Sequence, residues 1–124
     1  MSYDIRLGVK VEGGNNLFAV IDEPSEYKNP TYNLGKMFRE CTGRNFEQGR
    51  WYKVSDVLPL IEKGVRKLKF SPQKYRRFEP ENGWGTVESA LQGLEAMLEC
   101  IRNNTETSCM TWNAIPIELM YVAW

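Results

Sequence analysis

The chain has 124 residues, of which 42% are apolar and 26% charged, a composition typical of a globular protein long enough to bury a core. Its sixteen basic and sixteen acidic residues cancel, which argues against general nucleic-acid binding, because neutralising phosphates needs a basic excess. Histidine is absent, so the commonest general base and zinc ligand are missing. We therefore expect no enzymatic activity, no metal site and no cofactor.

The same totals bear on where the protein works. No stretch has the length of apolar sequence that spans a bilayer, and the first residues lack the pattern of a signal peptide. We therefore expect a cytoplasmic protein that does not associate with membranes. Three cysteines, two of them on apolar helix stripes, indicate buried free thiols rather than a disulfide framework.

The N-terminal segment has the alternating pattern of a half-buried strand from Tyr3 to Glu12. Gly13-Gly14-Asn15-Asn16 supplies residues that adopt the positive φ angles of a tight hairpin turn. A return strand is predicted from Leu17 to Ile21. These features predict an antiparallel β-hairpin at the start of the fold.

Three longer helices are predicted from the spacing of their apolar residues. The first runs from about Asn33 to Thr42, with Thr31 or Asn33 as its cap and Gly43 as its C-terminal stop. The second follows Ser55 as N-cap, with Pro59 near its start, and the third runs from Thr86 as N-cap to Arg102. The expected buried stripes are Leu34, Met37, Phe38 and Cys41; Val57, Leu58, Ile61, Val65 and Leu68; and Val87, Ala90, Leu91, Leu94, Met97, Leu98 and Ile101.

The remaining segments connect these elements. Residues 44–53 are predicted to be a mixed loop, residues 71–78 a short helical turn, and residues 103–110 a polar connector. Alternation from Ile117 onward predicts a closing strand that joins the N-terminal hairpin. The sequence thus predicts a single domain, residues 1–124, of the α+β class: a small antiparallel sheet with three helices packed on one face.

The first candidate site is the loop Asn82-Gly83-Trp84-Gly85-Thr86. A helix N-terminus offers unpaired backbone N–H groups and a positive dipole to an anion, and an indole stacks on planar rings. Because glycine has no side chain, the backbone can approach a ligand closely. The alternative interpretation is a tight turn in which Trp84 closes the edge of the core.

A second loop, residues 29–33, brings Tyr32 and Asn33 to another helix N-terminus. Ordinary capping with a buried tyrosine is the alternative here. If both helix starts lie at one end of the sheet, the two loops line a single concave site. Arg76 and Arg77, just before the first loop, are then placed to neutralise a phosphate, although taken alone they favour the simpler interpretation of a solvated helical face.

Arginine and aromatic residues also favour protein interfaces. The alternative partner-binding set is drawn from residues 44–52 and 74–78, and tryptophans near the C-terminus suggest an apolar patch for homo-oligomerisation. The residues concerned are Arg44, Arg50, Trp51, Tyr52, Lys74, Tyr75 and Phe78 for the partner surface, and Trp112 and Trp124 for the oligomer.

Three stretches carry a resemblance: MSYDI at residues 1–5, NPTYNLGKMF at residues 29–38 and NGWGT at residues 82–86. They resemble short uncharacterised proteins of bacteriophages, prophages and mobile elements. What the resemblance implies is context, because small phage-encoded proteins often counter host defence. Such proteins bind a nucleotide immune signal, or dock on a defence protein such as a CRISPR effector.

Together these observations predict a counter-defence protein of the host cytoplasm that binds and sequesters a nucleotide-derived signalling molecule. Tyr32 and Trp84 are expected to stack on the ligand, and backbone N–H groups after Gly83 and before Leu34 to hold phosphate. Arg76 or Arg77 would neutralise charge. The alternative hypothesis is a protein-binding inhibitor of a host defence protein.

Overall fold

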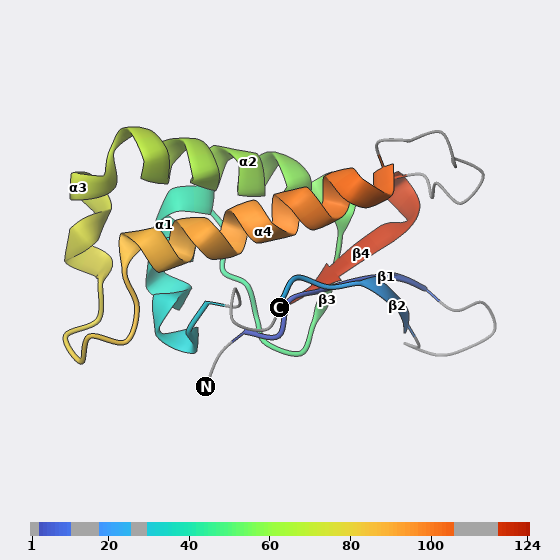
Figure 1. Cartoon of the computed structure of the whole chain (residues 1–124), viewed down its shortest axis with the longest axis horizontal. Helices are drawn as coiled ribbons and strands as arrows, with labels where there is room; N and C mark the ends of the chain where they lie inside the picture. The colour runs from blue at the N-terminus through green and yellow to red at the C-terminus, as the bar shows by residue number, and fades with distance from the viewer. Residues whose placement is uncertain (1–2, 11–17, 26–29, 106–116) are drawn as a thin grey trace.

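Four antiparallel strands form one sheet in the order β2-β1-β4-β3 (Figure 1). The strands are β1 (Arg6–Lys10), β2 (Phe18–Asp22), β3 (Trp51–Lys53) and β4 (Met120–Ala123). The computed structural model describes residues 3–10, 18–25, 30–105 and 117–124, apart from the side chains of residues 32 and 105.

The predicted hairpin is present, with β1 paired to β2 from Lys10 opposite Phe18 to Leu7 opposite Asp22. A register irregularity between Leu7 and Gly8 interrupts the ladder. Leu7 is buried on one side of the strand while Arg6 and Lys10 are exposed on the other, as the alternation predicted. The hairpin turn at residues 13–16 lies outside the described residues.

The closing strand also joins the hairpin, and β4 pairs with β1 so that Leu7 lies opposite Val122. It is shorter than predicted, because residues 117–119 form the 3-10 helix η5 (Ile117–Leu119) instead of strand. A fourth strand, β3, was missed. Its three residues pair with β4, Tyr52 opposite Val122, in a stretch that we predicted as loop.

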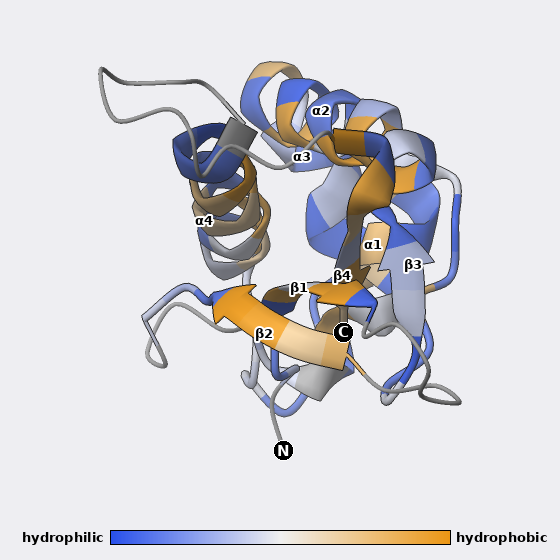
Figure 2. Cartoon of the chain, turned by 90° about the vertical axis from the view of Figure 1, so that its right-hand side faces the viewer, coloured by the Kyte–Doolittle hydropathy of each residue, from blue (hydrophilic) through white to orange (hydrophobic). Residues whose placement is uncertain are grey.

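The helices α1 (Gly35–Thr42), α2 (Val54–Phe70) and α4 (Val87–Thr105) cover one face of this sheet, which confirms the predicted α+β class (Figure 2). Between α2 and α4 lie the short α3 (Pro72–Tyr75) and the 3-10 helix η3 (Arg76–Phe78). Among the described residues, no helix combines the length and apolar character needed to cross a membrane.

Two predicted helix starts are wrong. A 3-10 turn, η2 (Tyr32–Leu34), precedes α1, so the N-cap position falls on Leu34 rather than on Thr31 or Asn33. The helix ends as predicted at Gly43, whose N–H donates to the Arg39 carbonyl and whose left-handed φ of 85° turns the chain away from the helix. Likewise, α2 begins at Val54, and Ser55 lies inside the helix with its cap position at Lys53.

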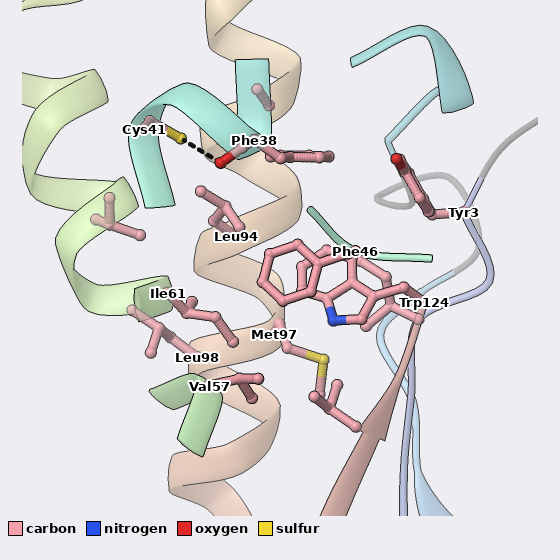
Figure 3. Close-up of a cluster of buried hydrophobic side chains, with 14 of the residues drawn as sticks. Tyr3, Phe38, Cys41, Phe46, Val57, Ile61, Leu94, Met97, Leu98 and Trp124 are labelled. Carbon is pink, nitrogen blue, oxygen red and sulfur yellow. Dashed lines mark hydrogen bonds between the residues drawn. The ribbon is translucent and has the colours of Figure 1, made fainter. Parts of the chain in front are cut away.

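The side chains between the helices and the sheet form the core drawn in Figure 3. The predicted stripes are buried there, except that Leu58 and Leu91 are only partly covered. Close helix contact requires glycine at residue 64, because a Cβ there would lie 2.8 Å from Thr42 Cγ2 and 3.0 Å from Leu94 Cδ1.

Trp124 lies inside the core, with 1% of its surface exposed. Its indole stacks on Phe46 at 4.1 Å and contacts Tyr3 edge-on at 5.9 Å (Figure 3). The expectation that Trp124 contributes to an exposed apolar patch is therefore wrong. Trp112, the other tryptophan of that patch, lies outside the described residues.

The outer face of the sheet carries its own aromatic cluster. Phe18 of β2 stacks on Trp51 of β3 at 4.5 Å, and Tyr121 of β4 contacts Phe18 at 5.2 Å. The rings meet above Gly8, where a Cβ would lie 2.9 Å from the Trp51 ring and 2.7 Å from the Ala19 carbonyl oxygen. The cluster thus joins both edge strands across the sheet.

Candidate functional site

The two loops selected from the sequence lie in contact. A Cβ on Gly85 would come within 2.8 Å of both Thr31 Cγ2 and Leu34 Cδ2, so the loop at residues 82–86 packs against Thr31 and the end of η2. Gly85 has a φ of 133°, which L side chains rarely adopt. Trp84 is 67% exposed, so it does not close the core. The ring of Tyr32 lies outside the described part, and its pairing with Trp84 stays a prediction.

Backbone N–H groups at the start of α4, which we expected to hold phosphate, already donate hydrogen bonds to acceptors of the protein. The Ser89 N–H donates to Thr86 Oγ1 at 3.1 Å, and the Thr86 N–H donates to Ser89 Oγ at 2.9 Å. This reciprocal cap confirms Thr86 as the N-cap residue. In addition, the Val87 N–H donates to Glu79 Oε2 at 2.8 Å. The protein therefore places its own acceptors at this helix start.

Arg76 is held by carboxylates of the same chain. Its guanidinium lies 2.6 Å from Glu88 Oε1 and 3.3 Å from Glu79 Oε2. The hydrogen bond from Arg76 is the main cause that lowers the pKa of Glu88 to about 2, and the same pair raises the pKa of Arg76. Because two carboxylates of the chain already pair with its guanidinium, Arg76 is less available to a ligand phosphate than we expected.

The other residues of the predicted phosphate site form an exposed turn. The Trp84 N–H donates to Asn82 Oδ1 at 2.9 Å, and the Gly83 N–H donates to the Pro80 carbonyl at 3.1 Å. Arg77 lies with its guanidinium 4.8 Å from the centre of the Phe78 ring. The loop therefore uses its polar groups to fix its own shape.

The alternative partner-binding residues do not form one exposed patch. Tyr75 is 3% exposed and belongs to the core, whereas Trp51 is half-buried in the cluster on the outer sheet face. Arg44 lies 4.9 Å above the Tyr52 ring, and Arg50 pairs with Glu47 at 2.8 Å. Lys74 is exposed, with its ammonium 5.7 Å from the Tyr75 ring centre.

A hollow of about 630 Å³ lies beside the start of α1, and we call it the α1 hollow. Its volume is within the range of small-molecule sites, which is roughly 300–1,000 Å³. Residues of η2 and α1 form one wall, the loop before β3 forms the other, and Tyr3 and Phe46 contribute aromatic surface. Its lining residues are Tyr3, Asn33, Gly35, Lys36, Arg39, Asn45, Phe46, Glu47 and Gln48.

The α1 hollow carries positive charge. Lys36 and Arg39 line it one turn apart on α1, and neither forms an ion pair within the described part of the chain. Among the described residues that line it, the only carboxylate is that of Glu47, which is paired with Arg50. Amide groups of Asn33, Asn45 and Gln48 add hydrogen-bond donors and acceptors. The arrangement suits an anionic molecule that also carries polar ring or ribose groups.

Of the predicted ligand-binding residues whose side chains the structure describes, only Asn33 lines the α1 hollow. Lys36 and Arg39 were missed, although their spacing on a predicted helix directly after Asn33 was a usable signal. No feature of the sequence pointed to the opposite wall of the hollow, because residues 45–48 show no periodic pattern. A second groove, about 550 Å³ between α2 and α4, is less suited to an anion, because Glu95 and Glu99 line it and Lys69 is paired with Glu95.

In the part of the chain that the structure describes, no group of three cysteine, aspartate or glutamate side chains is placed to hold a metal ion. Burial raises the pKa of both the Cys41 and Cys100 thiols to about 12, so neither is a ready nucleophile. Comparison of the chain with protein families, with curated proteins and with solved structures finds no match.

Proposed function

We propose that this chain is a non-enzymatic binding protein that sequesters a small anionic molecule of the nucleotide class in the α1 hollow. The observation that carries the proposal is the pair Lys36 and Arg39, which line a hollow of about 630 Å³ without an ion pair to any described carboxylate. Such cations form charge-assisted hydrogen bonds with phosphate oxygens, and arginine binds them in a bidentate manner.

The polar surroundings favour a nucleotide over inorganic phosphate. The hollow is much larger than a phosphate ion, and Asn33, Asn45 and Gln48 offer the amide groups that base edges and ribose hydroxyls need. This proposal keeps the nucleotide ligand predicted from the sequence but moves its phosphate from the start of α4 to the side chains of α1.

The biological setting rests on the resemblance to short phage and mobile-element proteins. A small protein that binds a nucleotide signal without turning it over lowers the free concentration of that signal. We therefore propose counter-defence by sequestration in the host cytoplasm. The absence of histidine and the high thiol pKa values support binding without turnover.

Isothermal titration calorimetry tests this function with a panel of cyclic dinucleotides, cyclic trinucleotides and cyclic ADP-ribose isomers. We expect at least one member to bind, and the same molecule to be recovered chemically intact. Arg39→Gln should weaken that binding tenfold or more, whereas Arg77→Gln, which removes the same charge from the Phe78 ring, should leave it unchanged. Silence across the panel would refute the proposal.

A second candidate, an inhibitor that binds a host defence protein, is favoured by one observation. Trp84 is 67% exposed in a turn shaped by Asn82, and exposed tryptophans often anchor protein interfaces. Purification from defence-active cells separates the two candidates. A sequestering protein retains a small molecule detectable by mass spectrometry, whereas an inhibitor retains a stoichiometric protein that Trp84→Ala releases.

A further inference from the structure

The balanced total charge conceals a strong segregation along the chain. Residues 36–77 contain twelve lysines and arginines against four acidic residues, a net charge of +8. Residues 78–124 contain one basic residue against seven acidic residues, a net charge of −6. The basic segment comprises α1, β3, α2, α3 and η3, and Figure 2 shows α1 and β3 on the side away from α4.

Contacts between elements place several of these cations on one surface. Lys63 of α2 reaches the end of α1, where its ammonium would lie 3.7 Å from a Cβ on Gly43. Lys67 lies one turn further along α2 than Lys63, so the two ammonium groups share one side of that helix. The ammonium of Lys74 lies 5.7 Å from the centre of the Tyr75 ring.

The same surface continues onto η3. The Phe78 ring has two cations near it, the Arg77 guanidinium at 4.8 Å and the Lys36 ammonium at 5.6 Å. We call the surface formed by Lys63, Lys67, Lys74 and Arg77 the basic surface. None of these four cations forms an ion pair with a described carboxylate, and the acidic residues on α1 and α2 are Glu40, Asp56 and Glu62.

The carboxylates on the acidic side of the molecule do not cancel the attraction between the basic surface and an anion in solution. At about 0.1 M salt, charges are screened over roughly 10 Å. The helices of a small domain are about 10 Å in diameter, and α4 alone is roughly 28 Å long. An extended polyanion on the basic surface is therefore attracted by the nearby cations more than it is repelled by carboxylates on the far side.

An exposed aromatic ring lies among these cations. Phe70 is 83% exposed and follows Lys67 by three residues on α2, so the two share one side of the helix. Single-stranded nucleic acids are bound by cations that follow the backbone and by aromatic rings on which bases stack. An acidic protein partner fits the charge, but its interface needs a larger apolar centre, and Tyr75 beneath this surface is 3% exposed.

We propose that the basic surface binds single-stranded nucleic acid, with Lys63, Lys67 and Lys74 on the phosphates and Phe70 stacked on a base. This function goes beyond the nucleotide site, because the α1 hollow is lined by Lys36 and Arg39 of α1, whereas the phosphate contacts proposed here come from α2 and α3. The two proposals therefore stand or fall on different residues.

Fluorescence anisotropy of a labelled dT20 strand tests the proposal, with a duplex of equal length and poly-glutamate as competitors. We expect dT20 to bind at 50 mM salt, with an affinity that falls steeply as the salt concentration rises. The triple variant Lys63→Gln, Lys67→Gln, Lys74→Gln should lose tenfold or more in affinity. Phe70→Ala should lower the affinity for dT20 about fivefold and reduce the preference for single strands over duplex.

A matched control removes three positive charges elsewhere, as Arg6→Gln, Lys10→Gln, Arg102→Gln, and should bind dT20 like the unaltered chain. Circular dichroism checks that each variant is folded. No binding of dT20, an equal loss in the control, no effect of Phe70→Ala, or competition by poly-glutamate as strong as that by dT20 would each overturn the proposal. Nucleotide binding in the α1 hollow should be intact in the triple variant.

Discussion

The guanidinium of Arg76 lies 2.6 Å from the carboxylate of Glu88, across the loop that separates η3 from α4. The same guanidinium contacts Glu79, whose carboxylate accepts the N–H of Val87 at the start of α4. Anions are attracted to helix N-termini by the dipole and by unpaired N–H groups. Here the anions are the carboxylates of Glu79 and Glu88. Their contacts join α4 to η3 and leave little room for an external phosphate.

The Arg76–Glu88 pair predicts an unusual titration. The pKa of Glu88 is lowered from 4.5 to about 2, chiefly by the hydrogen bond from Arg76. Because the folded-state pKa is the lower one, the pair stabilises the fold above about pH 4.5, and this stabilisation is lost as the pH falls toward about 2. A carbon-13 NMR titration should give a midpoint near 2 that Arg76→Met moves upward. A midpoint near 4.5 in the unaltered chain would contradict the pairing.

Removing the α4 cap should destabilise the protein measurably. Thr86→Ala deletes the hydroxyl that accepts the Ser89 N–H, which should lower the free energy of unfolding by about 1 kcal/mol. Ser55→Ala is the matched control, because Ser55 lies inside α2 and caps nothing. Urea denaturation should show the loss for Thr86→Ala only. An equal loss of unfolding free energy for Ser55→Ala would show that Ser55 acts as a cap of α2.

A single methyl group at residue 8 should disturb the outer face of the sheet. In Gly8→Ala the new Cβ meets the Ala19 carbonyl oxygen at 2.7 Å and the Trp51 ring at 2.9 Å. Because the first contact is with backbone, side-chain movement alone does not relieve it, and we expect a loss of about 1–3 kcal/mol in unfolding free energy. In a Trp51→Ala background, Gly8→Ala should cost less unfolding free energy than in the unaltered chain but should still be destabilising, because the contact with the Ala19 carbonyl remains. A neutral Gly8→Ala variant in urea denaturation would refute the close contact.

The buried thiols should be unreactive in the folded protein. Burial raises the pKa of Cys41 and Cys100 to about 12, so almost no thiolate is present at pH 8. With Cys109→Ser to remove the third thiol, Ellman's reagent should label neither cysteine under native conditions and both in denaturant. Fast labelling of Cys41 or Cys100 before unfolding would contradict their burial.

Elements with a clear periodic pattern were predictable, whereas β3 and the 3-10 turn η2 were not. The stripe of α4, from Val87 to Ile101, repeats over several turns and is buried as expected except at Leu91, which is partly covered. The three residues of β3 are too few for an alternating pattern, and they become strand only because β4 lies alongside them. Ser55 resembles a cap locally, but β3 leads directly into α2, so the helix begins at Val54.

The candidate site shows the same limit. The sequence identified two aromatic loops before helices, and Gly85 does lie against Thr31 and Leu34. It could not show that the donors at the start of α4 are taken by Glu79, Thr86 and Ser89, because the Glu79 contact depends on where η3 packs. Nor could it bring the loop at residues 45–48 opposite Lys36 and Arg39, since that wall is created only by the tertiary fold.

Amide chemical-shift mapping of the nitrogen-15-labelled protein tests the central claim most directly. Titration with the panel of cyclic nucleotides and cyclic ADP-ribose isomers should move the amides of residues 33–39 and 45–48 most, and Arg39→Gln should abolish the change. Shifts centred on residues 82–86 instead would return the ligand to the start of α4. The absence of shifts with every member of the panel would contradict nucleotide binding by this protein.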